Sequence, residues 1–214
     1  MLANACAELA QFNESAKLYE REWKLNEKLD GPQSPTALLA MNNLATVLND
    51  LDRDAESEAL HLRVLEIRER SLGANDLSVA ESLNNLGNVY RKVGRYADAE
   101  RVMLRAIKIQ AQALRERDPI VAKSYNNLGN IYADQARLLD AEQALLHCRE
   151  LLVAALGPDH PELTANLASL GVNFEQQRTL RRCRGDAAAM LADHRTGRGR
   201  RQPTCGRRVG QHRR

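Results

Sequence analysis

Paired asparagines recur along the chain, and they are the side chains best suited to hold a ligand. The stretch SLNNLGNVYRKVGRYADAE runs from Ser82 to Glu100, and SYNNLGNIYADQARLLDAE runs from Ser124 to Glu142. An asparagine side chain both donates and accepts hydrogen bonds, so it can pair with either polar group of a peptide backbone. A row of such amides could hold an extended chain without fixing its sequence.

Catalytic and metal-binding constellations are not apparent among the other residues. The five histidines are scattered, and His160 lies in a Pro-Asp-His-Pro turn. His147 and Cys148 are neighbours within an expected helix, so their side chains point in different directions. The four cysteines lack disulfide or zinc spacing, and no glycine-rich phosphate loop occurs. We therefore expect a protein that is not an enzyme and has no metal or cofactor.

A fixed period must position the asparagines. The same residue recurs 42 positions later over much of the chain, and Leu2, Leu44, Leu86, Leu128 and Leu170 form one such series. Self-similarity at a period of roughly 20–50 residues is typical of stacked repeats, each built from one supersecondary unit.

Each unit reads as two helices joined by a tight turn. In residues 77–118, Leu83, Leu86 and Tyr90 recur at helical spacing, and Gly94 interrupts the pattern. A second helical pattern then comprises Tyr96, Ala99, Met103, Ala106, Ile107 and Ile109. A helix pair of this kind cannot bury its apolar surface alone, so we expect it to stack on neighbouring pairs.

Proline- and glycine-containing linkers separate the units, and Pro35, Pro119 and Pro161 suit the first turn of a following helix. We expect five units in phase, of which the first and the last are partial. They cover about residues 1–30, 35–72, 77–114, 119–156 and 161–177.

The unit resembles the tetratricopeptide repeat. The matching positions are Leu83, Leu86, Gly87, Tyr90, Gly94, Tyr96, Ala99, Met103 and Ala106, and then Tyr125, Leu128, Gly129, Tyr132, Ala141, Leu145 and Cys148. The 42-residue length, the paired asparagines and the linker LGPDHP are similar to those of kinesin light chain repeats. The resemblance covers roughly residues 1–177, but Asp52 and Asp54 stand where glycine and tyrosine are usual. It implies an all-α, right-handed solenoid of stacked helix-turn-helix repeats that acts as a protein–protein interaction scaffold.

The same resemblance implies that the first helices line a concave groove that holds an extended peptide. In the unit at 77–114, Asn84 and Asn88 belong to a stripe separate from the core residues. The second asparagines, Asn43, Asn85 and Asn127, are expected to bond to a neighbouring helix or loop instead. The predicted groove residues are Asn42, Asn49, Asn84, Asn88, Arg91, Lys92, Lys123, Asn126 and Asn130.

The net charge of +3 conceals two different kinds of sequence. Residues 178–214 hold twelve arginines and two aspartates, giving +10, so residues 1–177 sum to −7. This tail is aperiodic and poor in apolar residues, so we expect it to be disordered. It is either a basic arm for nucleic acid or a terminus translated out of frame. Codons can be chosen for residues 180–186 that, read one base later, encode Tyr-Asp-Ala-Ala-Glu-Ala, which would open a second helix.

No apolar stretch is long enough for a membrane span, and no leader pattern opens the chain. We expect a cytoplasmic protein with a protein or peptide partner. Two alternatives stay open: a nucleic-acid-associated protein acting through its tail, and a regulatory fragment of a larger multidomain protein. Incomplete end units would also expose apolar helix faces, which favours self-association.

Overall fold

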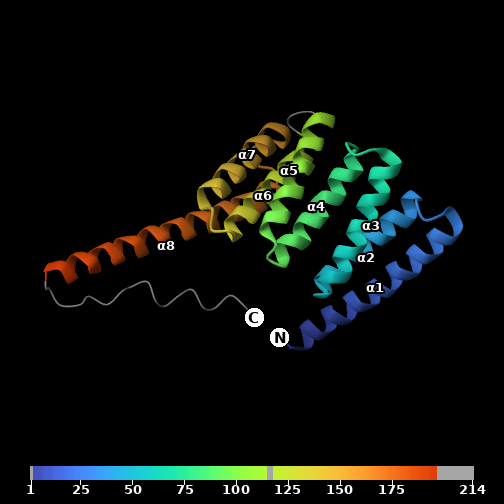
Figure 1. The fold of residues 1–214 in the computed structure, drawn as a ribbon, viewed down its shortest axis with the longest axis horizontal. Helices are drawn as coiled ribbons and strands as arrows, with labels where there is room; N and C mark the ends of the chain where they lie inside the picture. Colours follow the sequence, from blue (N-terminus) through green and yellow to red (C-terminus); the bar gives the residue numbers. More distant parts are fainter. Residues whose placement is uncertain (1, 115–117, 197–214) are drawn as a thin grey trace.

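Helices follow one another along the described chain and fold back in antiparallel pairs (Figure 1). The structure, a computed structural model, describes residues 2–114 and 118–196, with side chains described for 11–114 and 118–182. The helices of this part are α1 (Leu2–Asp30), α2 (Pro35–Asp50), α3 (Asp54–Leu72), α4 (Leu77–Lys92), α5 (Tyr96–Ala113), α6 (Pro119–Asp134), α7 (Leu138–Leu156) and α8 (Leu163–Thr196). The expected all-α solenoid is confirmed, and no helix described here has the length and apolar character to cross a bilayer.

The first helix of each complete unit starts at a polar cap. Ser34 Oγ accepts a hydrogen bond from the backbone N–H of Ala37 at 3.2 Å at the start of α2. Asp76 and Asp118 accept equivalent bonds at the starts of α4 and α6, at 2.7 and 2.8 Å. Each cap satisfies a backbone donor that has no partner within the helix, so the linker sequence fixes where the helix begins.

The turn inside each complete unit requires a left-handed residue. Gly94 has φ of 78°, and the equivalent Asp52 and Ala136 have φ of 58° and 59°. Aspartate tolerates this conformation better than most residues because its short polar side chain can bond locally. The departure from the repeat pattern at Asp52 therefore leaves the turn geometry unchanged.

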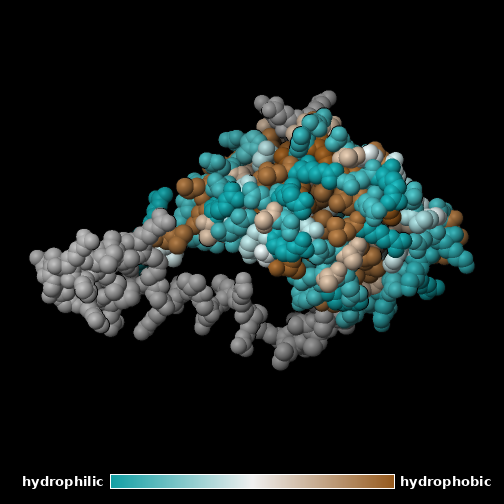
Figure 2. Space-filling model, viewed as in Figure 1, coloured by the Kyte–Doolittle hydropathy of each residue, from teal (hydrophilic) through white to brown (hydrophobic). Residues whose placement is uncertain are grey.

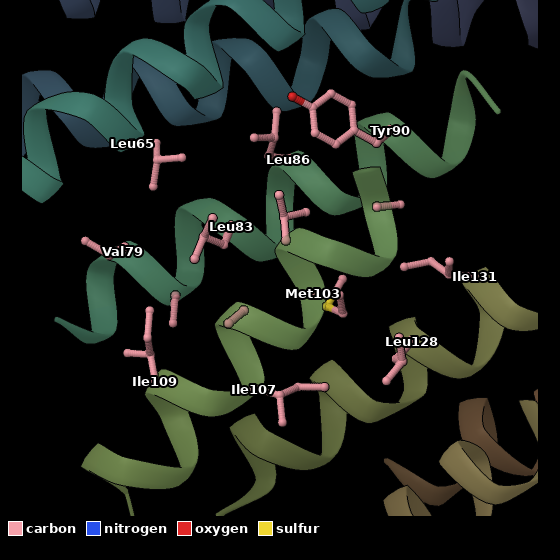
Figure 3. Packing of buried hydrophobic residues seen from close by; sticks show 14 residues of the cluster. Leu65, Val79, Leu83, Leu86, Tyr90, Met103, Ile107, Ile109, Leu128 and Ile131 are labelled. Atoms are coloured by element: carbon pink, nitrogen blue, oxygen red, sulfur yellow. The ribbon is translucent and has the colours of Figure 1, made fainter. Parts of the chain in front are cut away.

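The core forms where the two helices of a unit approach closely (Figure 3). Leu83 and Leu86 on α4 pack with Met103 and Ile107 on α5, and Leu128 of the next unit joins the same cluster. A Cβ atom on Gly87 would lie 2.9 Å from Met103 Cε, so glycine permits this close approach. The cluster spans two units, so stacking buries what one pair cannot.

The first helices lie on the inner side of the solenoid. Besides their contacts with second helices, α4 contacts α6, and α6 contacts α8. No comparable contact joins the second helices α3, α5 and α7 in the described part. The first helices therefore line the concave face, and the second helices splay apart on the convex face. On the surface viewed in Figure 2, apolar side chains are interspersed among polar ones.

The last helix differs from the sequence expectation. An irregular chain was expected after Gln177, whereas α8 continues as one helix to Thr196 and projects from the stacked units (Figure 1). Residues 178–196 contain no proline and are rich in alanine and arginine, which both favour helix. The rest of the tail, residues 197–214, lies outside the described residues.

Candidate binding groove

A cavity of about 440 Å³ opens between α4 and α6 on the concave side. Amide side chains from Asn84, Asn85, Asn88 and Asn127 contribute to its lining. Leu77 and Ile120 add apolar surface and are 37% and 50% exposed. The site thus combines several hydrogen-bond donors and acceptors with a small apolar area.

The second asparagines of two pairs, Asn85 and Asn127, contribute to this cavity, and Asn85 also makes the expected bond to a neighbouring helix, through Asn42 on α2. Asn85 and Asn127 are half-buried and contribute to the lining. Asn85 follows Glu81 by four residues and precedes Asn88 by three, so the three share one helix face. Asn84 shares that face with Asn88 at a spacing of four residues and also lines the cavity, so the spacing in the sequence did not separate the two asparagines.

The first asparagine of the first pair is buried between units. Asn42 is 6% exposed, and its Oδ1 accepts a hydrogen bond from Asn85 Nδ2 at 2.9 Å. A side chain so enclosed joins α2 to α4 and cannot present its amide to a ligand. The structure therefore corrects the prediction that Asn42 lines the groove.

The other first asparagines also touch the following unit. Asn84 Oδ1 lies 3.1 Å from Ser124 Oγ, and its Nδ2 donates to the Ala80 carbonyl at 3.2 Å. Asn126 Oδ1 accepts from Asn166 Nδ2 at 3.3 Å. Both asparagines are half-buried, so part of each side chain also reaches the surface. Their amides help to link neighbouring units.

The remaining predicted asparagines have different surroundings. Asn88 is exposed beside the cavity, and Asn130 is half-buried at the equivalent position of α6. Neither side chain makes a hydrogen bond within the described residues. Asn49 instead belongs to the turn after α2, where its Nδ2 donates to Asp54 Oδ1 at 3.2 Å and its carbonyl accepts from Lys92 Nζ. Asn88 and Asn130 are therefore the predicted amides with the greatest capacity to bind a ligand.

The predicted cations form ion pairs with carboxylates of neighbouring units. The pairs are Arg91–Asp134 at 2.8 Å, Lys92–Asp52 at 2.7 Å, Lys92–Asp54 at 3.0 Å and Lys123–Glu162 at 3.3 Å. Burial lowers the pKa of Lys92, but hydrogen bonds to the two aspartates outweigh this, so its pKa is raised. Most of these side chains remain partly exposed, and such pairs contribute at most about 1 kcal/mol each. Their charges are balanced locally, so they do not give the groove a dominant sign.

A buried polar layer supports the cavity from beneath. Gln110 on α5 is 2% exposed, and its Oε1 lies 2.7 Å from Ser124 Oγ on α6. The equivalent positions of the preceding interface hold Arg68 and Ser82, joined at 2.9 Å. Because buried polar groups are costly to leave unpaired, these contacts fix how α4 and α6 sit on the second helices behind them.

Comparison with known proteins agrees with this architecture. Two family models described as tetratricopeptide repeat match residues 36–112 and 121–162, which together are more than half of the chain. A search of curated proteins found no match. A helical repeat solenoid with a concave groove is an interaction scaffold by class, and this chain belongs to the tetratricopeptide repeat proteins.

Its solved structural neighbours are kinesin-light-chain-like. The crystal structure of BtubC (BKLC) from P. vanneervenii is 25% identical, with a TM-score of 0.62, over 71% of this chain and 60% of that one. The putative kinesin light chain of Podosopora anserina, with nearly identical TPR-like repeats, is 22% identical, with a TM-score of 0.66, over 91% and 90% of the two chains. A crystal structure of a variant of that protein gives a TM-score of 0.67. This chain therefore spans less than two thirds of BtubC and about the whole length of the Podosopora anserina structure.

Proposed function

We propose that the concave groove binds an extended segment of a partner protein. The observation that carries this proposal is the cavity between α4 and α6, which several amide side chains line. An extended peptide presents unpaired N–H and C=O groups along its length, and each asparagine can pair with either kind. Recognition by the faces of stacked helices needs no chemical step, so the proposed activity is binding alone.

In this proposal the asparagines have two tasks. Asn88 and Asn127 have no side-chain hydrogen bond in the described part of the chain, so both can pair with a peptide backbone. Asn42 and Asn84 bridge neighbouring units and hold the groove in shape. The partner's backbone would therefore contact Asn88 and Asn127, and Asn42 and Asn84 would support the groove from behind.

Specificity would come from the other side chains that line the cavity. Leu77 and Ile120 offer apolar contact to one side chain of the peptide. Glu81 on α4 and Lys123 on α6 also line the cavity, but they already form ion pairs with Arg68 and Glu162, so a uniformly charged peptide gains no net attraction there.

A displayed library of random peptides, selected on the full chain, tests this proposal. Selected peptides should bind the parent, and the pair Asn88→Ala with Asn127→Ala should weaken Kd about tenfold or more by calorimetry, because two hydrogen bonds are lost. Asn75→Ala, in the exposed linker between α3 and α4, is the matched control and should leave Kd unchanged. Binding that survives the double substitution, or the absence of any selected peptide, would refute the proposed groove.

A further inference from the structure

Helix α8 leaves open a face that the other units bury. Leu167 and Phe174 are 51% and 47% exposed. Their equivalents two periods earlier, Leu83 and Tyr90, are only 1% and 5% exposed, because α5 covers them. The apolar residues of a first helix are thus present in α8 without a second helix over them in the described residues.

Gly171 on α8 shows the same open space at the position of closest approach. A Cβ atom on Gly171 would meet nothing within 4 Å. At the equivalent Gly87 and Gly129, a Cβ atom would lie 2.9 Å from Met103 and 2.7 Å from Leu145, both on the second helix. The face around Gly171 is therefore shaped for a helix that packs closely against it.

Helix α1 has the complementary open face. Its place in the period is that of a second helix, and Leu18 and Leu25 are 59% and 53% exposed. Their equivalents Val102 and Ile109 on α5 are 6% and 2% exposed, in the cluster shared with α4. Among the described residues, α1 therefore has the apolar side of a second helix without the first helix that normally covers it.

We propose that α1 of one copy packs on α8 of another and completes a helix pair between the two chains. A Cβ on Gly87 would lie 3.4 Å from Val102 Cγ2, and the repeat register transfers this contact to Gly171 and Leu18. The occupant is a second copy because this chain itself has a second-helix face to match the first-helix face of α8. This inference does not depend on the proposed peptide groove, which lies at α4 and α6.

The lengths of the two helices fit the same register. Both overrun the repeat unit: α1 begins at Leu2, well before Phe12, and α8 continues past Gln177 to Thr196. In an antiparallel pair that places Leu18 opposite Gly171, the two helices therefore extend past the repeat unit on the same side of the interface.

Such an interface is head-to-tail, because two different faces meet. Contacts of this type generate a ring if the rotation closes and an open filament if it does not. Each copy then continues the solenoid of the preceding copy, because α8 of one chain and α1 of the next form a shared helix pair. The concave faces of successive copies would form one continuous surface.

Sedimentation and light scattering on the full chain test the proposal. The average mass should rise above the 23.9 kDa of one chain as concentration increases. Leu167→Glu with Phe174→Glu disables the α8 face, and Leu18→Glu with Leu25→Glu disables the α1 face. Each variant alone should remain a single chain, whereas an equal mixture should form a species of about twice that mass and grow no further.

The mixture distinguishes head-to-tail pairing from other modes. Each variant keeps one intact face, and only the mixture brings an intact α1 face to an intact α8 face. Leu62→Glu with Leu104→Glu is the matched control, since these leucines are 42% and 45% exposed on α3 and α5, and it should assemble as the parent does. Circular dichroism should show equal helicity for all variants, and raised salt suppresses association through the arginine-rich tail.

Three results would overturn the inference. The parent could remain a single chain at every concentration, which would leave the two faces for other proteins. Either variant alone could still form pairs, which would indicate contact between like faces. The mixture could fail to give the two-chain species although the parent assembles, which would place the interface elsewhere.

Discussion

Gly129 on α6 lies so close to Leu145 on α7 that a Cβ atom on the glycine would be 2.7 Å from the leucine Cγ. Gly87 and Met103 repeat this relationship one unit earlier. In the unit before that, the same two positions hold Ala45 and His61. In that unit, alanine on α2 stands where the later units have glycine, and histidine on α3 stands where they have methionine or leucine. Both members of the facing pair therefore change in the same unit.

Replacing Gly129 with alanine should destabilise the fold. Leu145 is fully buried and has little room to move, so Gly129→Ala is expected to lower the free energy of unfolding by about 1–3 kcal/mol. Gly171→Ala is the matched control, because nothing lies near its Cβ and alanine favours helix by up to about 1 kcal/mol. Urea denaturation at low protein concentration measures both, and equal effects would contradict the close-packing explanation.

His61 should make stability depend on pH. Its side chain is 2% exposed, and burial together with the nearby Arg68 lowers its pKa from 6.5 to about 4. The unfolded chain therefore binds a proton more tightly than the folded protein between these values. The free energy of unfolding should fall by about 2–3 kcal/mol as the pH drops through this window.

The variant His61→Leu isolates that contribution. Leucine occupies the equivalent position in α7, so the variant should fold and lack the part of the pH dependence that His61 supplies. Denaturation at about pH 7 and pH 4.5 should show a smaller difference for the variant than for the parent. His147→Leu changes an exposed histidine and should behave as the parent does. Identical pH profiles for His61→Leu and the parent would exclude His61 as the source.

Arg68 should stabilise the junction between α3 and α4. Arg68 is 8% exposed, and its Nη1 lies 2.7 Å from the Ser78 carbonyl and 2.9 Å from Ser82 Oγ. Arg68→Ala is expected to cost about 2–4 kcal/mol, because buried polar partners lose their bonds and a long side chain leaves the interface. Arg70→Ala, in the exposed pair with Glu66 on the same helix, should cost less than about 1 kcal/mol. A smaller loss at Arg68 than at Arg70 would refute this role.

The asparagines should separate into two classes by thermal unfolding. Asn42→Ala removes a buried acceptor and leaves the Asn85 amide unpaired, so it should cost about 1–2 kcal/mol. Asn88→Ala changes an exposed residue without a side-chain hydrogen bond in the described part, so its effect should stay within about 0.5 kcal/mol. Equal losses would mean that Asn88 also has a structural partner.

The period and the apolar spacing made the helices, the turns and the stacked fold predictable from sequence. Leu83, Leu86 and Tyr90 were expected in the core and are 1–5% exposed. These features could be predicted because they depend on short-range geometry: the periodicity of a helix, the cap that starts it and the residue that ends it. The extent of α8 was not foreseen, because its arginine-rich second part lacks the apolar period that marks a packed helix.

The roles of the paired asparagines depended on where one unit meets the next. The sequence alone determined that amides repeat on the first helices and that the chain stacks as a solenoid. Only the tertiary structure decided that Asn42 bonds to Asn85 across the junction and that Asn127 faces the cavity. A helix places neighbouring residues about 100° apart, so adjacent asparagines necessarily face different surroundings. Which of them reaches the groove is set by the rotation of each helix against its neighbours, and that rotation comes from the packing of the whole stack.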